Sequence, residues 1–225
     1  MNGAVVLLSG GIDSSTLLHY VCKLYGAKNV HALTFRYGQK HSRECLSAKW
    51  QAKHAGVGRH VIIQLTPFFK YIAGGSVLTD AEKLIPSLDE IRAANRQHPP
   101  TYVPHRNLLF LSLAVSYAEA NKLSCVFFAA QHTDSYSYWD CTPEFVKRLN
   151  LVLNLNRGNK VTVKAPFIRF TKAQVIKSGL KLGVNFAHTW TCYRGLQKPC
   201  MECPSCVERM RAFQQIGVSD PLLQN

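Results

Sequence analysis

Two stretches of this 225-residue chain combine residue types and spacings that could do chemistry. The first, residues 9–15, reads Ser-Gly-Gly-Ile-Asp-Ser-Ser and follows an apolar run at residues 5–8. Glycines let backbone N–H groups approach an anion, and a helix that begins at Asp13 would add its positive dipole end. The Walker pattern G-x-x-x-x-G-K-[ST] and the dinucleotide pattern G-x-G-x-x-G are both absent. An ordinary capped βα turn is the alternative. We expect phosphate binding at Leu8, Ser9, Gly10, Gly11, Asp13, Ser14, Ser15 and Thr16.

The other such stretch carries Cys192, Cys200, Cys203 and Cys206 in the spacing C-x7-C-x2-C-x2-C. A Cys-x2-Cys turn places two sulfur atoms on one side of the backbone, ready for one tetrahedral ion. The set therefore predicts a metal site, with zinc as the expected ion. An iron–sulfur cluster also takes four cysteines, and disulfides are a third alternative that a reducing compartment disfavours.

Composition narrows the class of protein. A hydrophobic content of 47% supports a real core, and the length suits one domain with a small appendage. The apolar start is too short for a signal peptide and no run reaches transmembrane length, so we expect a cytoplasmic protein without a membrane partner. The net charge of +14 suits polyanions such as ATP. Because the basic residues are scattered, a nucleic acid is not the favoured partner.

The glycine-rich stretch and the four cysteines must be positioned by the surrounding secondary structure. Elsewhere in the chain, apolar runs alternate with amphipathic stretches. This alternation predicts an α/β fold with a doubly wound, parallel, five-stranded sheet, in which ligands bind at the carboxyl ends of the strands. The predicted strands are residues 5–8, 29–35, 60–65, 124–130 and 161–166. The predicted helices are residues 13–25, 42–54, 108–121, 143–155 and 170–183.

Residues 9–15 resemble the PP-loop of the ATP pyrophosphatase superfamily, which grips the pyrophosphate that leaves when ATP adenylates a substrate. Over nearly its whole length the chain is also similar to the 7-cyano-7-deazaguanine synthase family. The matching motifs are residues 9–15, 37–41, 103–111, 133–134, 138–141, 143–146, 164–167, 171–173 and 189–193, followed by the four cysteines. This resemblance implies an adenine-nucleotide α-hydrolase-like fold with a small C-terminal zinc-binding segment.

The resemblance also implies a reaction. An ATP-dependent carbon–nitrogen ligase would convert 7-carboxy-7-deazaguanine and ammonia into 7-cyano-7-deazaguanine, a precursor of queuosine and related bases. The carboxylate would be adenylated and then displaced by ammonia to give an amide. A second ATP would activate the amide oxygen, and loss of AMP would leave the nitrile. Catalysis of this kind rests on positioning and on charge stabilisation of departing pyrophosphate.

The resemblance assigns further residues to this chemistry. Lys172 and Arg106 are the expected catalytic cations. The simpler alternatives are that Lys172 is a solvated helix residue and that Arg106 is a surface arginine at a helix start. The expected cofactors are ATP, Zn²⁺ and Mg²⁺ bound with ATP. The sequence is compatible with a homodimer but does not determine the oligomeric state. The expected substrate-binding residues are Tyr37, Gln39, Asn107, Asp134, Tyr138 and Asp140.

The predicted division places an ATP-binding domain at residues 1–185 and a zinc-binding segment at residues 186–225. Residues 66–100 interrupt the strand–helix rhythm and are expected to form a partly helical insert.

Five residues depart from the family pattern. The family usually has an acid at Arg36, glycines at His105 and Ser137, a proline at Trp139 and an arginine at Thr142. The nitrile stays the favoured product because both adenylations use one ATP site. The alternatives are a divergent enzyme that stops at the amide or joins the acid to something else, a tRNA-modifying PP-loop enzyme, and a nucleic-acid-binding zinc module.

Overall fold

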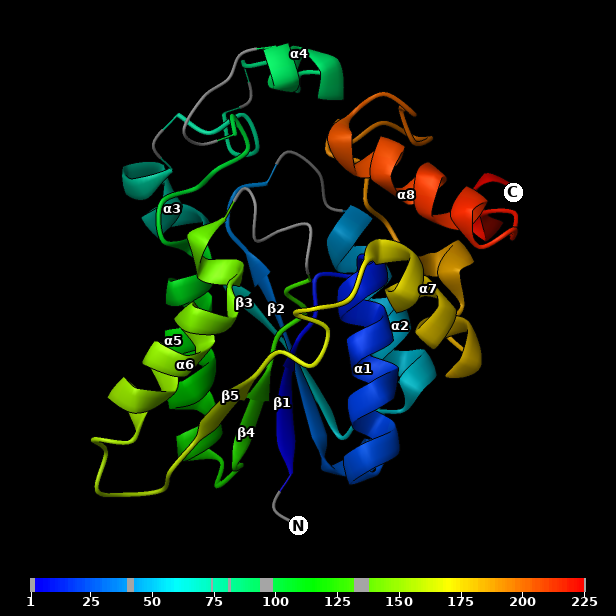
Figure 1. The fold of residues 1–225 in the computed structure, drawn as a ribbon. Helices are drawn as coiled ribbons and strands as arrows, with labels where there is room; N and C mark the ends of the chain where they lie inside the picture. Colours follow the sequence, from blue (N-terminus) through cyan, green and yellow to red (C-terminus); the bar gives the residue numbers. More distant parts are fainter. Residues whose placement is uncertain are drawn as a thin grey trace.

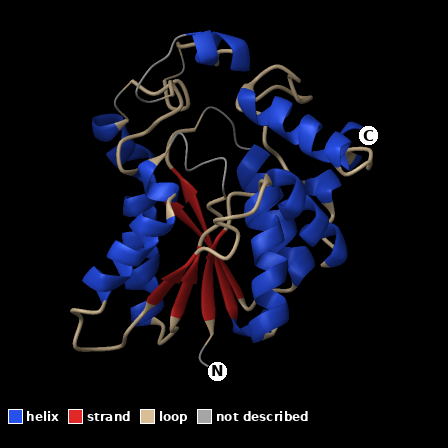
Figure 2. Ribbon diagram, in the orientation of Figure 1, coloured by secondary structure: helices blue, strands red, loops and turns tan. Residues whose placement is uncertain are grey.

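The computed structural model describes residues 3–39, 43–73, 75–80, 82–93, 99–131 and 138–224. Its centre is a five-stranded sheet in the order β3-β2-β1-β4-β5, drawn in red in Figure 2. Every neighbouring pair of strands is parallel. The expected α/β fold with a parallel five-stranded sheet is therefore confirmed. The strands are β1 (Ala4–Leu7), β2 (Val30–Arg36), β3 (Arg59–Gln64), β4 (Cys125–Phe127) and β5 (Thr162–Lys164).

Helices cover both faces of this sheet (Figure 1), with α1, α2 and α7 on one face and α5 and α6 on the other. Their bounds lie close to the predicted ones. They are α1 (Ile12–Tyr25), α2 (Arg43–Ala55), α5 (Arg106–Ala120), α6 (Pro143–Leu153) and α7 (Lys172–Lys181).

The alternation of β1 side chains explains the two helical layers. Ala4 and Val6 belong to the core beneath α1 and α7, whereas Val5 belongs to the core beneath α5 and α6. All three side chains are fully buried, because successive residues of a central strand point to opposite covered faces. The sheet therefore holds α1 and α5 on opposite sides of one strand, and both helices begin beside the end of that strand.

Strands β4 and β5 are shorter than predicted. The expected strand at residues 124–130 pairs as a strand over only three residues, because β1 offers β4 no partner beyond Val6. The chain then turns at Ser9, where the glycine loop begins. Phe128 keeps one hydrogen bond to β5, from its N–H to the Lys164 carbonyl, and residues Phe128 to Ala130 contribute to the wall of a pocket.

The insert expected at residues 66–100 is partly helical, with α3 (Thr66–Ile72) and α4 (Leu88–Ala93). It does not stand apart from the chain, because its apolar residues pack against the cysteine-bearing segment. This third core cluster consists of Val77, Leu78, Ile85, Trp190, Cys192, Cys203 and Cys206.

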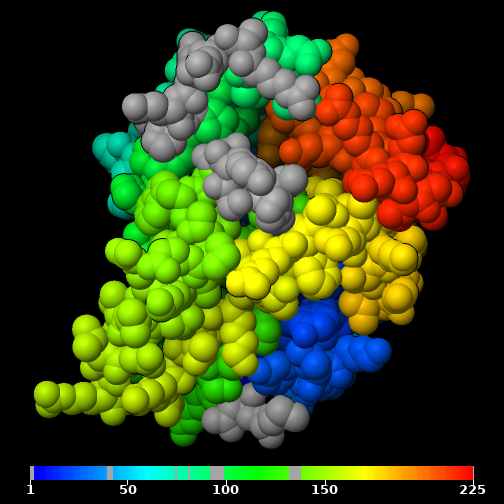
Figure 3. Space-filling model, in the orientation of Figure 1, coloured from blue at the N-terminus to red at the C-terminus, as the bar shows by residue number. Residues whose placement is uncertain are grey.

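The C-terminal segment contains a helix that was not predicted, α8 (Pro204–Gln215). Its Ala212 and Phe213 join the core beneath α1 and α7, so the segment packs on the α/β domain, as the orange and red region of Figure 3 shows beside the yellow one. The division into two parts at residue 185 stays a prediction. Among the described helices, none has the length and the apolar character that crossing a membrane requires.

Candidate functional site

A cavity of about 300 Å³ lies at the carboxyl edge of the sheet. Its floor is formed by residues at or just beyond the ends of three strands, namely Leu8 after β1, Phe35 in β2 and Phe128 after β4. The strand order reverses between β1 and β4, which is where open α/β sheets bind ligands. The fold thus places a pocket at the position where the glycine loop turns into α1.

The loop is held by its own hydroxyl groups. The Ser14 Oγ atom lies 2.9 Å from the Ser9 Oγ atom and accepts a hydrogen bond from the Ser9 N–H at 3.2 Å. The Gly11 N–H donates to the Ser9 Oγ atom at 3.3 Å. Leu8, Ser9, Gly11, Asp13 and Ser14 all line the cavity. This cluster of hydroxyl and N–H donors at the start of a helix is suited to an anion.

The two loop glycines have different surroundings. Gly10 has φ +85°, and a Cβ atom placed there would lie 2.4 Å from the Glu44 carbonyl oxygen of α2. A Cβ atom on Gly11 would meet nothing closer than the Ser9 Oγ atom at 3.4 Å. Gly10 therefore sits against the backbone of α2, while Gly11 faces the cavity.

Two expected phosphate-binding residues lie elsewhere. Ser15 and Thr16 are fully buried and do not line the cavity. Successive residues of a helix turn by about 100°, so Ser14 faces the cavity while the next two side chains turn toward the core. Thr16 packs against Gly179 of α7, where an added Cβ atom would lie 2.7 Å from the Thr16 hydroxyl oxygen.

A lysine and two carboxylates form one wall of the cavity. The Lys172 ammonium, in the first turn of α7, pairs with the Asp13 Oδ2 atom at 2.5 Å. A capping box around Thr171 sets the start of this helix and so the place of Lys172. Glu208 reaches the same wall from α8. Burial raises the pKa of Glu208, and the charge of Lys172 acts in the opposite direction.

Arg106 and Tyr37 form the opposite wall. The Arg106 guanidinium donates to the Tyr37 hydroxyl at 3.3 Å and lies 5.7 Å from the centre of its ring. Gln39 also lines the cavity and holds the turn after β2, because its Oε1 atom accepts from the Tyr37 N–H at 2.8 Å. Arg106, one of the two expected catalytic cations, therefore faces the cavity beside the buried Tyr37 side chain.

The other expected substrate residues divide into three cases. Asn107 and Tyr138 line the cavity. Asp140 is buried and does not line it, because the 3₁₀ turn Trp139–Cys141 aims its carboxylate at the Asn107 amide, 3.1 Å away. Asp134 lies outside the described residues. The structure thus gives Asp140 the task of orienting Asn107.

The cavity is also lined by residues that were not among the expected site residues. They include Glu44 at the start of α2, together with Trp190, Thr191, Tyr193, Ser205, Glu208 and Arg209 from the cysteine-bearing segment. Burial raises the pKa of Glu44 to about 7, although the Arg106 charge opposes this rise. The sequence held one signal for Glu44, since it is an acid that directly follows the polar run at residues 37–43. No sequence pattern pointed to Ser205 and Glu208, because their helix α8 was not predicted.

Three of the five departures from the family pattern contact one another. His105 keeps a left-handed backbone, with φ 51°, that ordinarily favours glycine. Its ring contacts Trp139 edge-on at 5.5 Å, and the Thr142 hydroxyl donates to the Trp139 carbonyl at 3.0 Å. Arg36 is exposed at the end of β2, and Ser137 lies outside the described residues. His105, Trp139 and Thr142 form a group beside Arg106 and Tyr138, and none of the three lines the cavity.

The four expected metal ligands meet at one point. The sulfur atoms of Cys192, Cys200, Cys203 and Cys206 lie within 4.8 Å of one another, and no disulfide joins them. The Cys203 N–H donates to the Cys200 sulfur at 3.3 Å, and the Cys200 N–H donates to the Cys192 sulfur at 3.4 Å. Such bonds favour thiolates, so the cluster can bind a metal.

Two solved structures share the fold of this chain at low sequence identity. An NMN synthetase from Francisella tularensis matches with a TM-score of 0.53 at 16% identity, over 99% of this chain and 81% of that chain. The U34-tRNA thiolase NcsA from Methanococcus maripaludis, solved with its [4Fe-4S] cluster, matches with a TM-score of 0.50 at 16% identity, over 95% and 65%. These likenesses show that the chain shares the fold of both proteins, an α/β fold with a parallel sheet.

Sequence comparisons identify the family. The family model for queuosine biosynthesis protein QueC matches residues 3–217, and the chain belongs to that family. A 7-cyano-7-deazaguanine synthase from Archaeoglobus fulgidus is 45% identical over 99% of this chain and 90% of the relative. The synthase from Thermoplasma acidophilum is 42% identical over 97% and 90%. The family expected from the sequence is confirmed.

Proposed function

We propose that this chain is an ATP-dependent ligase that converts 7-carboxy-7-deazaguanine and ammonia into 7-cyano-7-deazaguanine. The observation that carries the proposal is the match to this family along residues 3–217, combined with one cavity that joins the PP-loop to Arg106. A carboxylate is a poor electrophile, so the reaction depends on adenylation and on stabilising the leaving pyrophosphate.

The pyrophosphate end of the cavity is built from α1 and α7. The Gly11 N–H and the hydroxyl groups of Ser9 and Ser14 would hold the pyrophosphate oxygens, and Lys172 would neutralise their charge. The substrate carboxylate attacks the α-phosphorus of ATP, the bond between the α- and β-phosphates breaks, and pyrophosphate leaves toward these donors. Lys172 already has a partner in Asp13, so its ammonium is held in place before ATP binds.

The substrate end is built from β2, α2 and α5. Arg106 presents two parallel N–H donors to a carboxylate. Ammonia then attacks the carbonyl carbon of the adenylate, AMP leaves, and the nitrogen loses a proton. A second adenylation activates the amide oxygen, and loss of AMP with the remaining N–H protons gives the nitrile. Glu44, rather than the inward-facing Asp140, would accept the N–H groups of the guanine-like ring.

Two metal ions are part of the proposal. Asp13 and Glu208 would hold Mg²⁺ together with the phosphates, and the Asp13 Oδ1 atom is buried without a hydrogen-bond partner among the described residues. The four sulfur atoms fit a tetrahedral Zn²⁺ that ties the C-terminal segment to the domain. A four-cysteine metal site and the use of ATP as a substrate support a cytoplasmic location. The homodimer stays a prediction.

One incubation tests the proposed function. The purified protein, 7-carboxy-7-deazaguanine, ammonium and excess ATP are mixed, and products are weighed by mass spectrometry, with ATP omitted as the control. The expected result is the nitrile, with pyrophosphate released only when the acid is present. A product that stays at the amide would refute nitrile synthesis. An acid that is not consumed would overturn the substrate assignment.

A further inference from the structure

The segment that leads from α7 to the first cysteine lies directly against the glycine loop. The Trp190 N–H donates to the Gly10 carbonyl at 2.9 Å. The Trp190 carbonyl oxygen lies 3.6 Å from the position that a Cβ atom on Gly11 would occupy. The loop is therefore enclosed between this segment and the backbone of α2.

The hydrogen bond from Trp190 controls a group that faces the cavity. A trans peptide is planar, so the Gly10 carbonyl and the Gly11 N–H point in opposite directions from one rigid unit. Because the carbonyl is held by Trp190, the Gly11 N–H is held toward the Ser9 hydroxyl at the cavity wall. The orientation of this anion donor thus depends on the position of Trp190.

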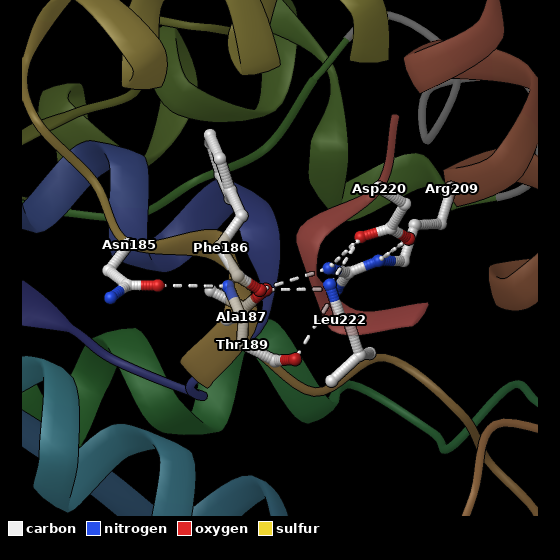
Figure 4. Close-up of polar contacts among 7 residues, drawn as sticks. All are labelled: Asn185, Phe186, Ala187, Thr189, Arg209, Asp220 and Leu222. Carbon is white, nitrogen blue, oxygen red and sulfur yellow. Dashed lines mark hydrogen bonds and ion pairs between the residues drawn. The ribbon is translucent and has the colours of Figure 1, made fainter. Parts of the chain in front are cut away.

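Arg209 of α8 holds the backbone immediately before Trp190 (Figure 4). Its Nη1 atom donates to the Thr189 carbonyl at 3.3 Å and to the Thr189 hydroxyl at 2.9 Å. Its Nη2 atom donates to the Phe186 carbonyl at 3.0 Å. Asp220 clamps the other edge of the guanidinium, with Nε–Oδ2 at 2.6 Å and Nη2–Oδ1 at 2.8 Å.

This network is poorly explained by stability alone. Arg209 is 3% exposed, and a buried ion pair commonly adds little over an apolar replacement of the same volume. What a guanidinium adds is a planar fork of donors in fixed directions. Arg209 uses that fork on two carbonyls and a hydroxyl of one short segment, so its effect is to fix where that segment lies.

We propose that Arg209 is a positioning residue for the PP-loop: it holds Thr189, so that the Trp190 N–H orients the Gly10–Gly11 peptide toward pyrophosphate. This inference rests on the proposed function, because it takes the loop to bind the pyrophosphate of ATP. It also assigns the cysteine-bearing segment a second task, which is to form and align one side of the ATP site.

The test measures inorganic pyrophosphate binding by calorimetry on metal-loaded protein that is shown to be folded. Arg209→Lys keeps the charge and loses the fork. Its affinity should fall at least about tenfold, since misplacing a group by about 1 Å can cost a hundredfold. In turnover assays KM for ATP should rise while KM for the acid stays near the wild-type value. Val163→Ala, a buried truncation in the edge strand β5, is the control for lost stability.

A second variant separates positioning from direct contact, because Arg209 also reaches the cavity. Thr189→Val keeps the shape of a buried side chain that does not line the cavity, and removes the hydroxyl that Arg209 holds. It should weaken pyrophosphate binding several-fold. Wild-type affinity in Arg209→Lys, wild-type affinity in Thr189→Val, or an equal loss in Val163→Ala would each overturn the proposal.

Two further results are decisive. If Arg209→Lys does not fold, the comparison of Thr189→Val with Val163→Ala settles the question alone. If wild-type protein binds no pyrophosphate, the ATP site of the proposed function fails and the positioning role fails with it. If Arg209→Lys and Thr189→Val both bind pyrophosphate as tightly as the wild type, the positioning role fails and the proposed function stands.

Discussion

Replacing Gly10 with alanine should destabilise the protein far more than the same change at its neighbour Gly11. At Gly10 a Cβ atom would lie 2.4 Å from the Glu44 carbonyl oxygen and 2.5 Å from the Ala48 nitrogen, both in the backbone of α2. Its φ of +85° also lies in the left-handed region. Left-handed backbone costs about 1–2 kcal/mol and overpacking about 1–3 kcal/mol, so we expect about 3 kcal/mol in all.

Gly11→Ala is the matched control. Its Cβ atom would make ordinary contacts, beginning with the Ser9 Oγ atom at 3.4 Å, and its φ of −79° suits any residue. A poorer helix cap and a less flexible unfolded chain act in opposite directions, so the net change should stay within about 1 kcal/mol.

Urea and thermal unfolding compare the two variants. For a chain of this size about 3 kcal/mol lowers Tm by about 6–12 °C. A Gly10→Ala protein whose unfolding free energy matches that of Gly11→Ala would show that the loop can move away from α2. That result would refute the close approach on which this reasoning depends.

Three other predictions follow from the site. Ser14→Ala and Lys172→Ala should each lower pyrophosphate release about a hundredfold. Lys172→Ala should also lower stability, by about 1–3 kcal/mol, because Asp13 loses its partner; a Lys172→Ala protein that unfolds at the wild-type midpoint would contradict this. The Glu44 pKa is raised to about 7, so the stability linked to its bound proton is complete below about 4.5 and is lost as the pH rises through 7. Glu44→Gln should therefore raise Tm at pH 8 and leave it nearly unchanged at pH 4.5; a gain confined to low pH would reverse the assignment. Cys203→Ser should reduce the bound metal and lower Tm, since metal binding is coupled to folding. Elemental analysis checks this prediction, and a brown, iron-containing protein would exclude zinc.

The sheet could be predicted because its strands are continuous apolar runs. Most residues of β1 and β2 are buried, and such apolar runs followed by amphipathic stretches leave few other folds. The glycine loop could also be predicted, because its anion-binding groups come from consecutive residues. The cysteine cluster could be read from spacing because Cys-x2-Cys turns bring their sulfur atoms together locally.

The remaining features depend on contacts between distant parts of the chain. The direction of the Asp140 carboxylate is set by Asn107 across the fold, which no local pattern reveals. Helix α8 has a polar sequence, and it joins the core through Phe213 and Ala212 on the side of α7 and through Cys206 in the third core cluster. For the same reason Glu208 could not be assigned to the cavity before α8 was placed.

The enclosure of the loop has a consequence for the order in which the protein is made. The cavity is lined by residues from Leu7 to Arg209, and Arg209 is clamped by Asp220. A ribosome delivers the sheet and α1 long before it delivers α8. Since domains fold as their residues emerge, the nascent chain would have its strands in place while the nucleotide pocket still lacked a wall. Binding of ATP would then report that synthesis has passed Asp220, so a stalled or clipped chain should retain its sheet and fail to bind nucleotide.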